Sequence, residues 1–223
     1  MKYTYTPSIP DEFLEIQDAG ERKQYLLTIL LPLVLKANKE IESERRLVMR
    51  IKRTWLWLSK KEKRLLGKLA KKYKVDTGDY DAMVEELLMK VDVLPPSLVL
   101  AQAAIESGWG TSRFAVDGNN LFGLRTLSGE GMVPRQQDEG RVFKVSQFDD
   151  LQSSIDYYLW NINTHPKYEE LRQIRSGSPY PYDPLLLAYG LRHYSEMGDE
   201  YVERLISLIE YNRLQDYDAV GLE

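Results

Sequence analysis

The sequence predicts a mainly helical protein that carries one small β-hairpin. Apolar residues recur every three or four positions through most of the 223-residue chain, which is the spacing of a buried helix face. Residues 124–145 depart from this pattern, because three glycines and a proline separate short apolar runs there, as turns separate strands. With 43% hydrophobic residues, the chain can bury a substantial core.

The first part of the chain is predicted to be helical after an extended lead. Residues 1–20 contain prolines that break helices, and they lack the charged start, apolar centre and cleavage site of a secretory signal. Residues 21–38 form the most hydrophobic helical segment, which Pro32 is expected to kink. Its apolar centre is too short for a membrane span, which needs about 20 residues. Residues 39–58 continue as a basic amphipathic helix.

Three further helices are predicted before the middle of the chain. Ser59 and Glu62 have the spacing of a capping box, so a helix of residues 59–73 begins there. A short helix follows at residues 81–90, and another at residues 96–106.

The C-terminal half is predicted to contain the hairpin and three more helices. A turn at Asp138, Glu139 and Gly140 suits the hairpin. The expected ranges are 111–123 for a loop, 132–136 and 141–145 for the strands, and 150–165, 184–194 and 199–209 for the helices.

The net charge of −4 conceals a strong asymmetry. Residues 44–74 contain thirteen Lys or Arg and two acidic residues, a balance of +11, so the rest of the chain carries −15. This basic block can bind polyanions weakly, or it can be a solvated face that balances an acidic remainder; no specific nucleic-acid binding is expected. The chain has no cysteine, which excludes a disulfide, a thiol nucleophile and a thiolate metal site.

Glu106 is the candidate catalytic residue because of where the predicted helix of residues 96–106 ends. That helix begins with Pro and Ser, which suit its first positions, and Gly108 suits its end. The negative end of the helix dipole disfavours a carboxylate there by about 0.3–1 kcal/mol, and apolar neighbours such as Trp109 also oppose ionisation. Both effects would raise the pKa of Glu106, and general-acid cleavage of a glycosidic bond requires such a protonated acid. The alternative is a helix-end Glu in an ion pair, for example with Arg113.

Two motifs resemble those of a known family. They are Ala103-Ala104-Ile105-Glu106-Ser107-Gly108-Trp109-Gly110 and Asn120-Leu121-Phe122-Gly123. In this order they resemble the peptidoglycan glucosaminidases of glycoside hydrolase family 73. Two further runs look like the Bax-type bacterial branch, namely Asn163-Thr164-His165-Pro166 and Tyr194-Ser195-Glu196-x-Gly198. The similarity covers about residues 94–214. It implies a lysozyme-like α+β domain, with a cleft between a helical and a β lobe and with Glu106 as the general acid.

The resemblance also implies a second catalytic group. Glycosidases use such a group to activate water or to receive positive charge. Glu139 has the best offset from Glu106, with Glu130 and Asp138 as alternatives, although acidic turn residues often serve solubility alone. Tyr194 matches a family tyrosine near the scissile bond; the alternative is a buried Tyr that supports the last helix. The residues predicted to bind substrate are Ser107, Trp109, Asn120, Phe122 and Tyr201.

These observations lead to one domain plan and three candidate functions. Residues 1–92 are predicted to be an N-terminal helical extension that packs on a glucosaminidase domain of residues 93–218. The leading hypothesis is an endo-acting hydrolase of the bacterial cell envelope, which cleaves the β-1,4 bond after N-acetylglucosamine in peptidoglycan. A lytic transglycosylase and a non-catalytic glycan-binding protein are the alternatives. No cofactor or metal is expected, since His165 and His193 are too few and too isolated for a metal site.

Overall fold

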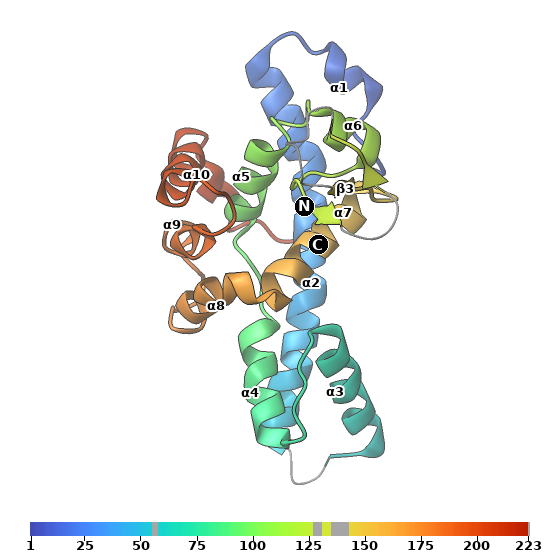
Figure 1. Cartoon of the computed structure of the whole chain (residues 1–223), viewed down its shortest axis with the longest axis vertical. Coiled ribbons are helices and arrows are strands. Elements are labelled where there is room, and N and C mark those ends of the chain that lie inside the picture. Colours follow the sequence, from blue (N-terminus) through green and yellow to red (C-terminus); the bar gives the residue numbers. More distant parts are fainter. Residues whose placement is uncertain (55–57, 127–130, 135–142, 223) are drawn as a thin grey trace. The chain divides into compact units, whose positions relative to one another are not determined.

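The computed structural model describes residues 1–54, 58–126, 131–134 and 143–222 (Figure 1). Within these ranges the protein has ten α-helices and one three-stranded antiparallel sheet, which confirms the predicted mainly helical fold with a small β element. The chain divides into two compact units, each assembled from separate stretches. The first unit comprises residues 1–37, 96–158 and 207–223, and the second comprises residues 38–95 and 159–206. The division of the sequence at residues 92 and 93 stays a prediction.

The first unit contains the middle of the chain together with both of its ends. Long helices α2 (Ala19–Thr54), α7 (Leu151–Thr164) and α10 (Asp199–Tyr211) contribute residues to both units. The elements that belong to the first unit alone are α1 (Asp11–Glu15), α5 (Pro96–Glu106), α6 (Arg113–Gly118), β1 (Arg125–Thr126), β2 (Gly131–Met132), β3 (Lys144–Ser146) and η4 (Leu214–Tyr217).

The second unit is helical throughout its described residues. Its own elements are α3 (Lys60–Lys72), α4 (Tyr80–Lys90), η2 (Pro166–Tyr168), α8 (Glu169–Ser176), α9 (Pro184–Ala188) and η3 (Tyr189–Leu191). In Figure 1, α3 and α4 lie on either side of the C-terminal half of α2. Ion pairs join that half of α2 to both neighbours, with Lys72 of α3 at 2.7 Å from Glu44 and Lys52 at 2.6 Å from Glu85 of α4.

Local sequence signals account for several helix boundaries. The capping box predicted at Ser59 and Glu62 is present, with both reciprocal hydrogen bonds formed. Helix α2 runs from Ala19 to Thr54 as one element, through Pro32, at which the sequence predicted a kink, and across the boundary between the predicted segments 21–38 and 39–58. Proline lacks an N–H and costs a helix interior about 3 kcal/mol. The buried leucines on both sides of Pro32 offset that cost.

The small sheet has the strand order β1-β3-β2, with both pairs antiparallel. Val145 lies opposite Arg125 on one side and Met132 on the other, so β3 is the central strand. The sequence predicted strands near β2 and β3 but missed β1. A strand of two residues is too short to show an alternating pattern.

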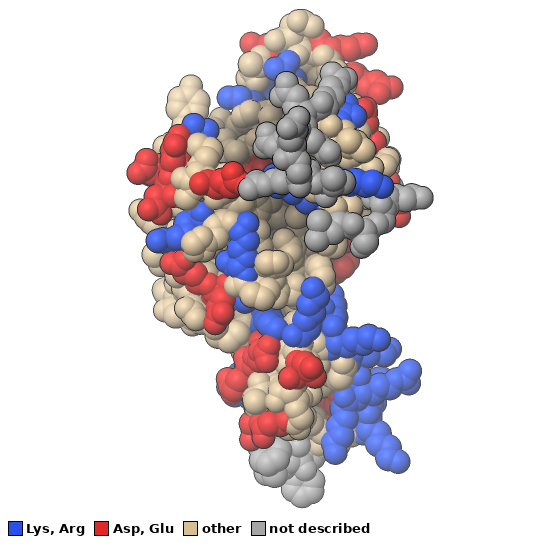
Figure 2. All heavy atoms as spheres, viewed as in Figure 1, with Lys and Arg blue, Asp and Glu red and all other residues tan. Residues whose placement is uncertain are grey.

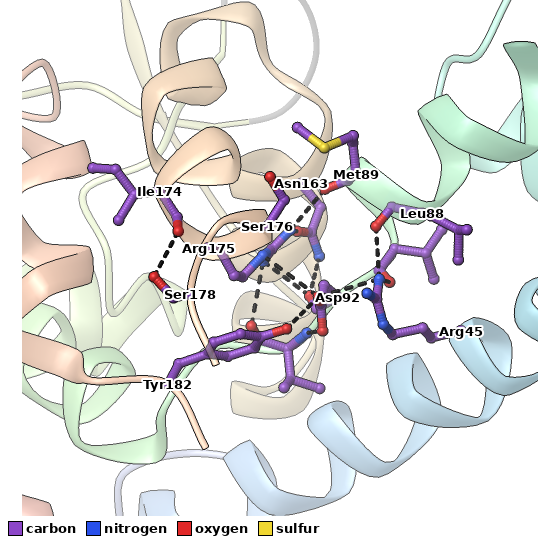
Figure 3. Close-up of polar contacts among 12 residues, drawn as sticks. Arg45, Leu88, Met89, Asp92, Asn163, Ile174, Arg175, Ser176, Ser178 and Tyr182 are labelled. Atoms are coloured by element: carbon purple, nitrogen blue, oxygen red, sulfur yellow. Dashed lines mark hydrogen bonds and ion pairs between the residues drawn. The ribbon is translucent and has the colours of Figure 1, made fainter. Parts of the chain in front are cut away.

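A buried polar cluster organises the second unit (Figure 3). Its centre is Asp92, whose carboxylate lies 3.1 Å from the Arg45 guanidinium and accepts a hydrogen bond of 2.7 Å from the Tyr182 hydroxyl. Arg175 is fully buried and donates to the carbonyls of Asp92 and Met89 and to the side chain of Asn163. Burial lowers the pKa of Arg175 to about 10, and burial and the bond to Asp92 raise the pKa of Tyr182 to about 12. The cluster therefore ties the end of α4 to α7, α8 and the segment before α9.

None of the described helices is both long enough and apolar enough to cross a membrane.

Candidate functional site

Helix α5 carries the candidate acid Glu106 and is buried along nearly its whole length. Its residues from Pro96 to Ala104 are all buried, and Glu106, its last residue, is partly exposed. The N-terminus of α5 is held by Asp218, whose carboxylate accepts from the Ser97 N–H at 2.8 Å and from the Ser97 hydroxyl at 2.7 Å. A carboxylate at this end of a helix is favoured by the helix dipole. The C-terminal segment of the chain thus fixes the start of the helix that presents Glu106.

A turn of left-handed residues ends α5 directly after Glu106. Gly108, Trp109 and Gly110 have φ values of 57°, 55° and 78°. The Trp109 N–H donates to the Ala104 carbonyl at 2.7 Å, a bond that closes the helix end. The hydroxyl of the buried Ser107 donates to the Ala103 carbonyl and accepts from the Gly110 N–H at 2.7 Å. The predicted substrate residue Ser107 therefore has its hydroxyl engaged on both sides by the turn.

Residues from the start of the chain support this turn. An ideal Cβ built on Gly110 would lie 3.0 Å from Leu26 Cδ1 and 3.1 Å from Phe13 Cζ, so a side chain at this position would crowd both residues. The ammonium group of Lys23 lies 4.7 Å from the ring centroid of Trp109, a cation–π contact. Trp109 as a whole is partly exposed.

The second motif forms a loop that is organised by Asn120. This side chain is buried, and its amide group donates to the carbonyls of Leu124 and Ser146 at 2.9 and 2.8 Å. Its oxygen accepts from the N–H groups of Phe122 and Leu124 at 3.3 and 3.0 Å. The amide of Asn120 thus uses its full hydrogen-bonding capacity on the loop and on β3.

The two motifs meet at the carboxyl group of Glu106. An ideal Cβ built on Gly123 would lie 3.3 Å from Glu106 Oε2, and Gly123 has a φ of 62°. A side chain at position 123 would therefore be strained and would crowd the carboxyl group. Because Gly123 is exposed and bears no side chain, the carboxyl group faces bare backbone there.

Aromatic packing positions the loop against α5. The buried ring of Phe122 stacks on the ring of Tyr158 with centroids 3.9 Å apart and planes 10° from parallel. The Tyr158 hydroxyl donates to the side-chain oxygen of Gln102 on α5. Phe122, predicted to bind substrate, is thus part of the packing behind the loop.

The alternative partner for Glu106, Arg113, is occupied elsewhere. Its guanidinium donates to the Val133 carbonyl at 2.7 Å and lies 4.9 Å from the ring centroid of Phe114. Among the residues that the structure describes, the contacts of Arg113 do not include Glu106.

Tyr194 and Tyr201 belong to the second unit. Their rings stack with centroids 5.6 Å apart, and Tyr194 also stacks on Tyr168 at 5.9 Å. Tyr168 and Tyr201 are buried, whereas Tyr194 is partly exposed.

The remaining predicted groups fall into two sets. Glu139 and its alternatives Glu130 and Asp138 lie outside the described residues, so the second catalytic carboxylate stays a prediction. His165 caps η2, with Nδ1 accepting from the Lys167 N–H at 3.1 Å. In the described ranges, no group of three or more His, Asp or Glu side chains is placed to hold a metal ion.

The sequence did not predict the residues that support the site from distant positions in the chain. Asp218, Phe13 and Lys23 carry no motif, and their roles depend on tertiary contacts. Tyr158 had a signal, because it lies on the apolar stripe of α7, but that stripe does not reveal its hydrogen bond to Gln102.

Comparison with known proteins places these motifs in a family. The family model for Glucosaminidase, described as mannosyl-glycoprotein endo-beta-N-acetylglucosaminidase, matches residues 81–214. Protein bax of Escherichia coli strain K12 is 31% identical over 211 residues, which cover 92% of this chain and 75% of that protein. Exo-glucosaminidase LytG of Bacillus subtilis strain 168 is 27% identical over 156 residues, or 60% of this chain and 50% of that protein. No solved structure gave a significant match. The resemblance inferred from the two motifs is confirmed: the chain belongs to the glucosaminidase family.

Proposed function

We propose that this protein is a glycoside hydrolase of bacterial peptidoglycan, which cleaves the β-1,4 bond on the reducing side of N-acetylglucosamine. The observation that carries the proposal is the meeting of Glu106 and Gly123, since both halves of the family pattern converge on one carboxyl group. The names of the family model and of the Bacillus subtilis relative both specify glucosaminidase activity. Because the substrate is the cell wall, the site of action would be the cell envelope.

Glu106 would act as the general acid. It would donate its proton to the glycosidic oxygen as the bond to the anomeric carbon breaks, and such proton transfer supplies about 10²–10⁴-fold in rate. Gly123 leaves backbone rather than a side chain beside Oε2, which suits the approach of a sugar. Both supports of α5, Asp218 at one end and the Ser107 turn at the other, would keep the carboxyl group in place.

The second catalytic group has two candidate solutions. Glu139 would activate water, or the acetamido group of the substrate would attack while Tyr194 orients it through a hydrogen bond that brings no charge. The side-chain amide of Asn120 hydrogen-bonds to the backbone of the loop and of β3, so we assign Asn120 a positioning role rather than a contact with the acetamido group. The variants Glu139→Gln and Tyr194→Phe distinguish these two alternatives. We expect a strong loss of catalytic activity in Tyr194→Phe. A fully active Tyr194→Phe enzyme, together with an inactive Glu139→Gln enzyme, would reverse this assignment.

Substrate contacts would come mainly from the partly exposed side chains. Trp109 and Tyr194 offer flat faces on which a sugar ring can stack. The buried Ser107 and Phe122 would support the site from within the first unit, and a substrate contact by Tyr201 stays a prediction.

The test is digestion of purified peptidoglycan by the wild type and by Glu106→Gln. We expect the variant to lose at least about a hundredfold in the release of reducing ends, because a general acid contributes that much. Glu210→Gln is the matched control, since it removes an exposed carboxylate from the same unit without touching the site. A Glu106→Gln enzyme that keeps more than about a tenth of the activity would rule out the general-acid role.

Product analysis separates the alternative functions. Mass spectra of the released fragments should show hydrated reducing ends, whereas a lytic transglycosylase would give anhydro sugars. Long fragments early in the digestion would indicate endo action, and single terminal sugars would indicate the exo action named for the Bacillus subtilis relative. Wall binding without any product would identify a non-catalytic glycan-binding protein.

A further inference from the structure

Helix α3 presents a row of basic side chains on the face opposite its packed side. Leu66, Leu69 and Ala70 are buried and form the packed side. The exposed residues on the opposite face recur at helical spacing and define what we call the α3 basic face: Lys60, Arg64, Lys68 and Lys71. With a rise of 1.5 Å per residue, neighbouring charges in this row are separated by about 4.5–6 Å along the helix axis.

The α3 basic face is not neutralised by nearby carboxylates. Four of the nine other cations of the predicted basic block have carboxylate partners, namely Arg45 with Asp92, Arg46 with Glu42, Lys52 with Glu85 and Lys72 with Glu44. By contrast, none of the four face residues has an ion pair with any residue in the described part of the chain. The acidic residue of α3 is Glu62, and its carboxylate accepts hydrogen bonds from the Ser59 N–H and hydroxyl in the capping box. The charge of the face is therefore available to an external anion.

Charge is distributed unevenly over the helices of this unit. Figure 2 shows basic side chains gathered over α3 and acidic side chains over α4. Helix α4 and its cap carry Asp79, Asp81, Glu85 and Glu86. An extended anionic surface would attract α3 and repel α4, so it would bind the unit in one orientation.

The shape and composition of the face favour a planar partner. The row lies on the outside of a single helix, so it can lie flat on a surface without a groove to receive a strand. The face carries no aromatic side chain on which a nucleic-acid base could stack. Because the apolar side of α3 is already packed, the helix cannot insert that side among acyl chains, and attachment would be electrostatic.

We propose that the α3 basic face docks this protein on membranes that contain anionic phospholipids. Clusters of four or more Lys or Arg on one helix face suit this contact, and each contributes about fivefold to binding near an anionic bilayer. The proposal is independent of the glycosidase activity, because α3 carries none of the residues assigned to catalysis.

The experiment is co-sedimentation of the full chain with vesicles of phosphatidylcholine, with or without one part in three of phosphatidylglycerol. We expect binding to the anionic vesicles alone, and we expect a rise in salt to weaken it because salt screens exposed charges. A variant with Lys60, Arg64, Lys68 and Lys71 replaced by Gln should bind at least about a hundredfold more weakly, given about fivefold per residue. Glutamine is nearly as good a helix former as Lys or Arg, so α3 should remain folded.

The matched control removes four exposed cations elsewhere, with Lys2, Lys39, Arg204 and Arg213 replaced by Gln. Both variants change the net charge from −4 to −8, so a difference between them isolates the face from total charge. Equal weakening in both variants, or no binding of the wild type to anionic vesicles, would overturn the proposal. Stronger face-dependent binding to a soluble phosphodiester polymer or to single-stranded DNA would overturn the membrane assignment. Activity on soluble glycan fragments should be unchanged in the α3 variant, which distinguishes this test from that of the glycosidase.

Discussion

Replacing Gly110 by Ala should destabilise the turn behind Glu106 more than the same change at Gly108. At Gly110 the new Cβ would lie 3.0 Å from Leu26 Cδ1 and 3.1 and 3.2 Å from two atoms of the Phe13 ring. Phe13 and Leu26 are both 0% exposed, so neither can move out into solvent. Overpacking of this kind costs about 1–3 kcal/mol. The left-handed φ of 78° adds about 1–2 kcal/mol, for a total of about 2–5 kcal/mol.

Gly108→Ala is the matched control, because it sits in the same turn and shares the conformational cost. Its φ is 57°, and the nearest atom to its Cβ would be Thr111 Oγ1 at an ordinary 3.5 Å. We therefore expect a loss of only about 1–2 kcal/mol from the backbone strain. The difference between the two variants, about 1–3 kcal/mol, measures the packing against Phe13 and Leu26.

Urea unfolding followed by tryptophan fluorescence gives the free energy of unfolding of each variant. A Phe13→Leu change should recover part of the loss in Gly110→Ala, since it removes ring atoms from the crowded site. Equal losses at positions 108 and 110, together with no coupling to Phe13, would refute the idea that the start of the chain supports this turn.

Two further predictions concern the second unit. Tyr182→Phe removes a hydrogen bond to the Asp92 carboxylate and should lower the free energy of unfolding by about 1.5–3 kcal/mol. The control Tyr180→Phe, at a residue that is 69% exposed, should have no effect. Equal losses in the two variants would contradict a central role for Asp92. Burial and the Lys167 cation lower the pKa of His165 below its ordinary value of 6.5. The unfolded chain therefore takes up the proton first, so stability should fall as the pH drops through 6.5. The thermal midpoint of His165→Asn, which keeps a capping acceptor, should fall less between pH 7.5 and 5.5, and an identical fall would refute the assignment.

The sequence predicted the local features of the site well. Helix α5 spans Pro96–Glu106, so it ends at the residue that the spacing of Pro96 and Gly108 indicated. The left-handed conformation of Gly108 agrees with its predicted role at the helix end. These features depend on neighbours within a few positions, which is the range that residue patterns report.

The contacts that hold the site could not be read from the sequence. Asp218 is a carboxylate near the end of the chain with no pattern around it, and only the fold brings it to Ser97. Asn120 belonged to a motif and was predicted to bind substrate, yet the structure places its amide in backbone hydrogen bonds of the loop. Similarly, Asn163 of the Asn-Thr-His-Pro run donates to the Asp92 carbonyl and accepts from Arg175. A motif reports which residues are required, but not whether they bind a ligand or the backbone.

Because Asp218 caps α5, the position of Glu106 depends on a residue that is synthesised well after the helix itself. The bond from Ser97 to Asp218 joins residues 121 positions apart, and Phe13 reaches Gly110 from the opposite end of the sequence. Contacts of such large separation form late in folding, because the intervening chain must first be ordered. During synthesis, at about 5–20 residues per second, α5 emerges several seconds before residue 218 does. The carboxyl group of Glu106 therefore gains its full support only after residue 218 has been made, so a chain that stops before this residue carries an unsupported acid.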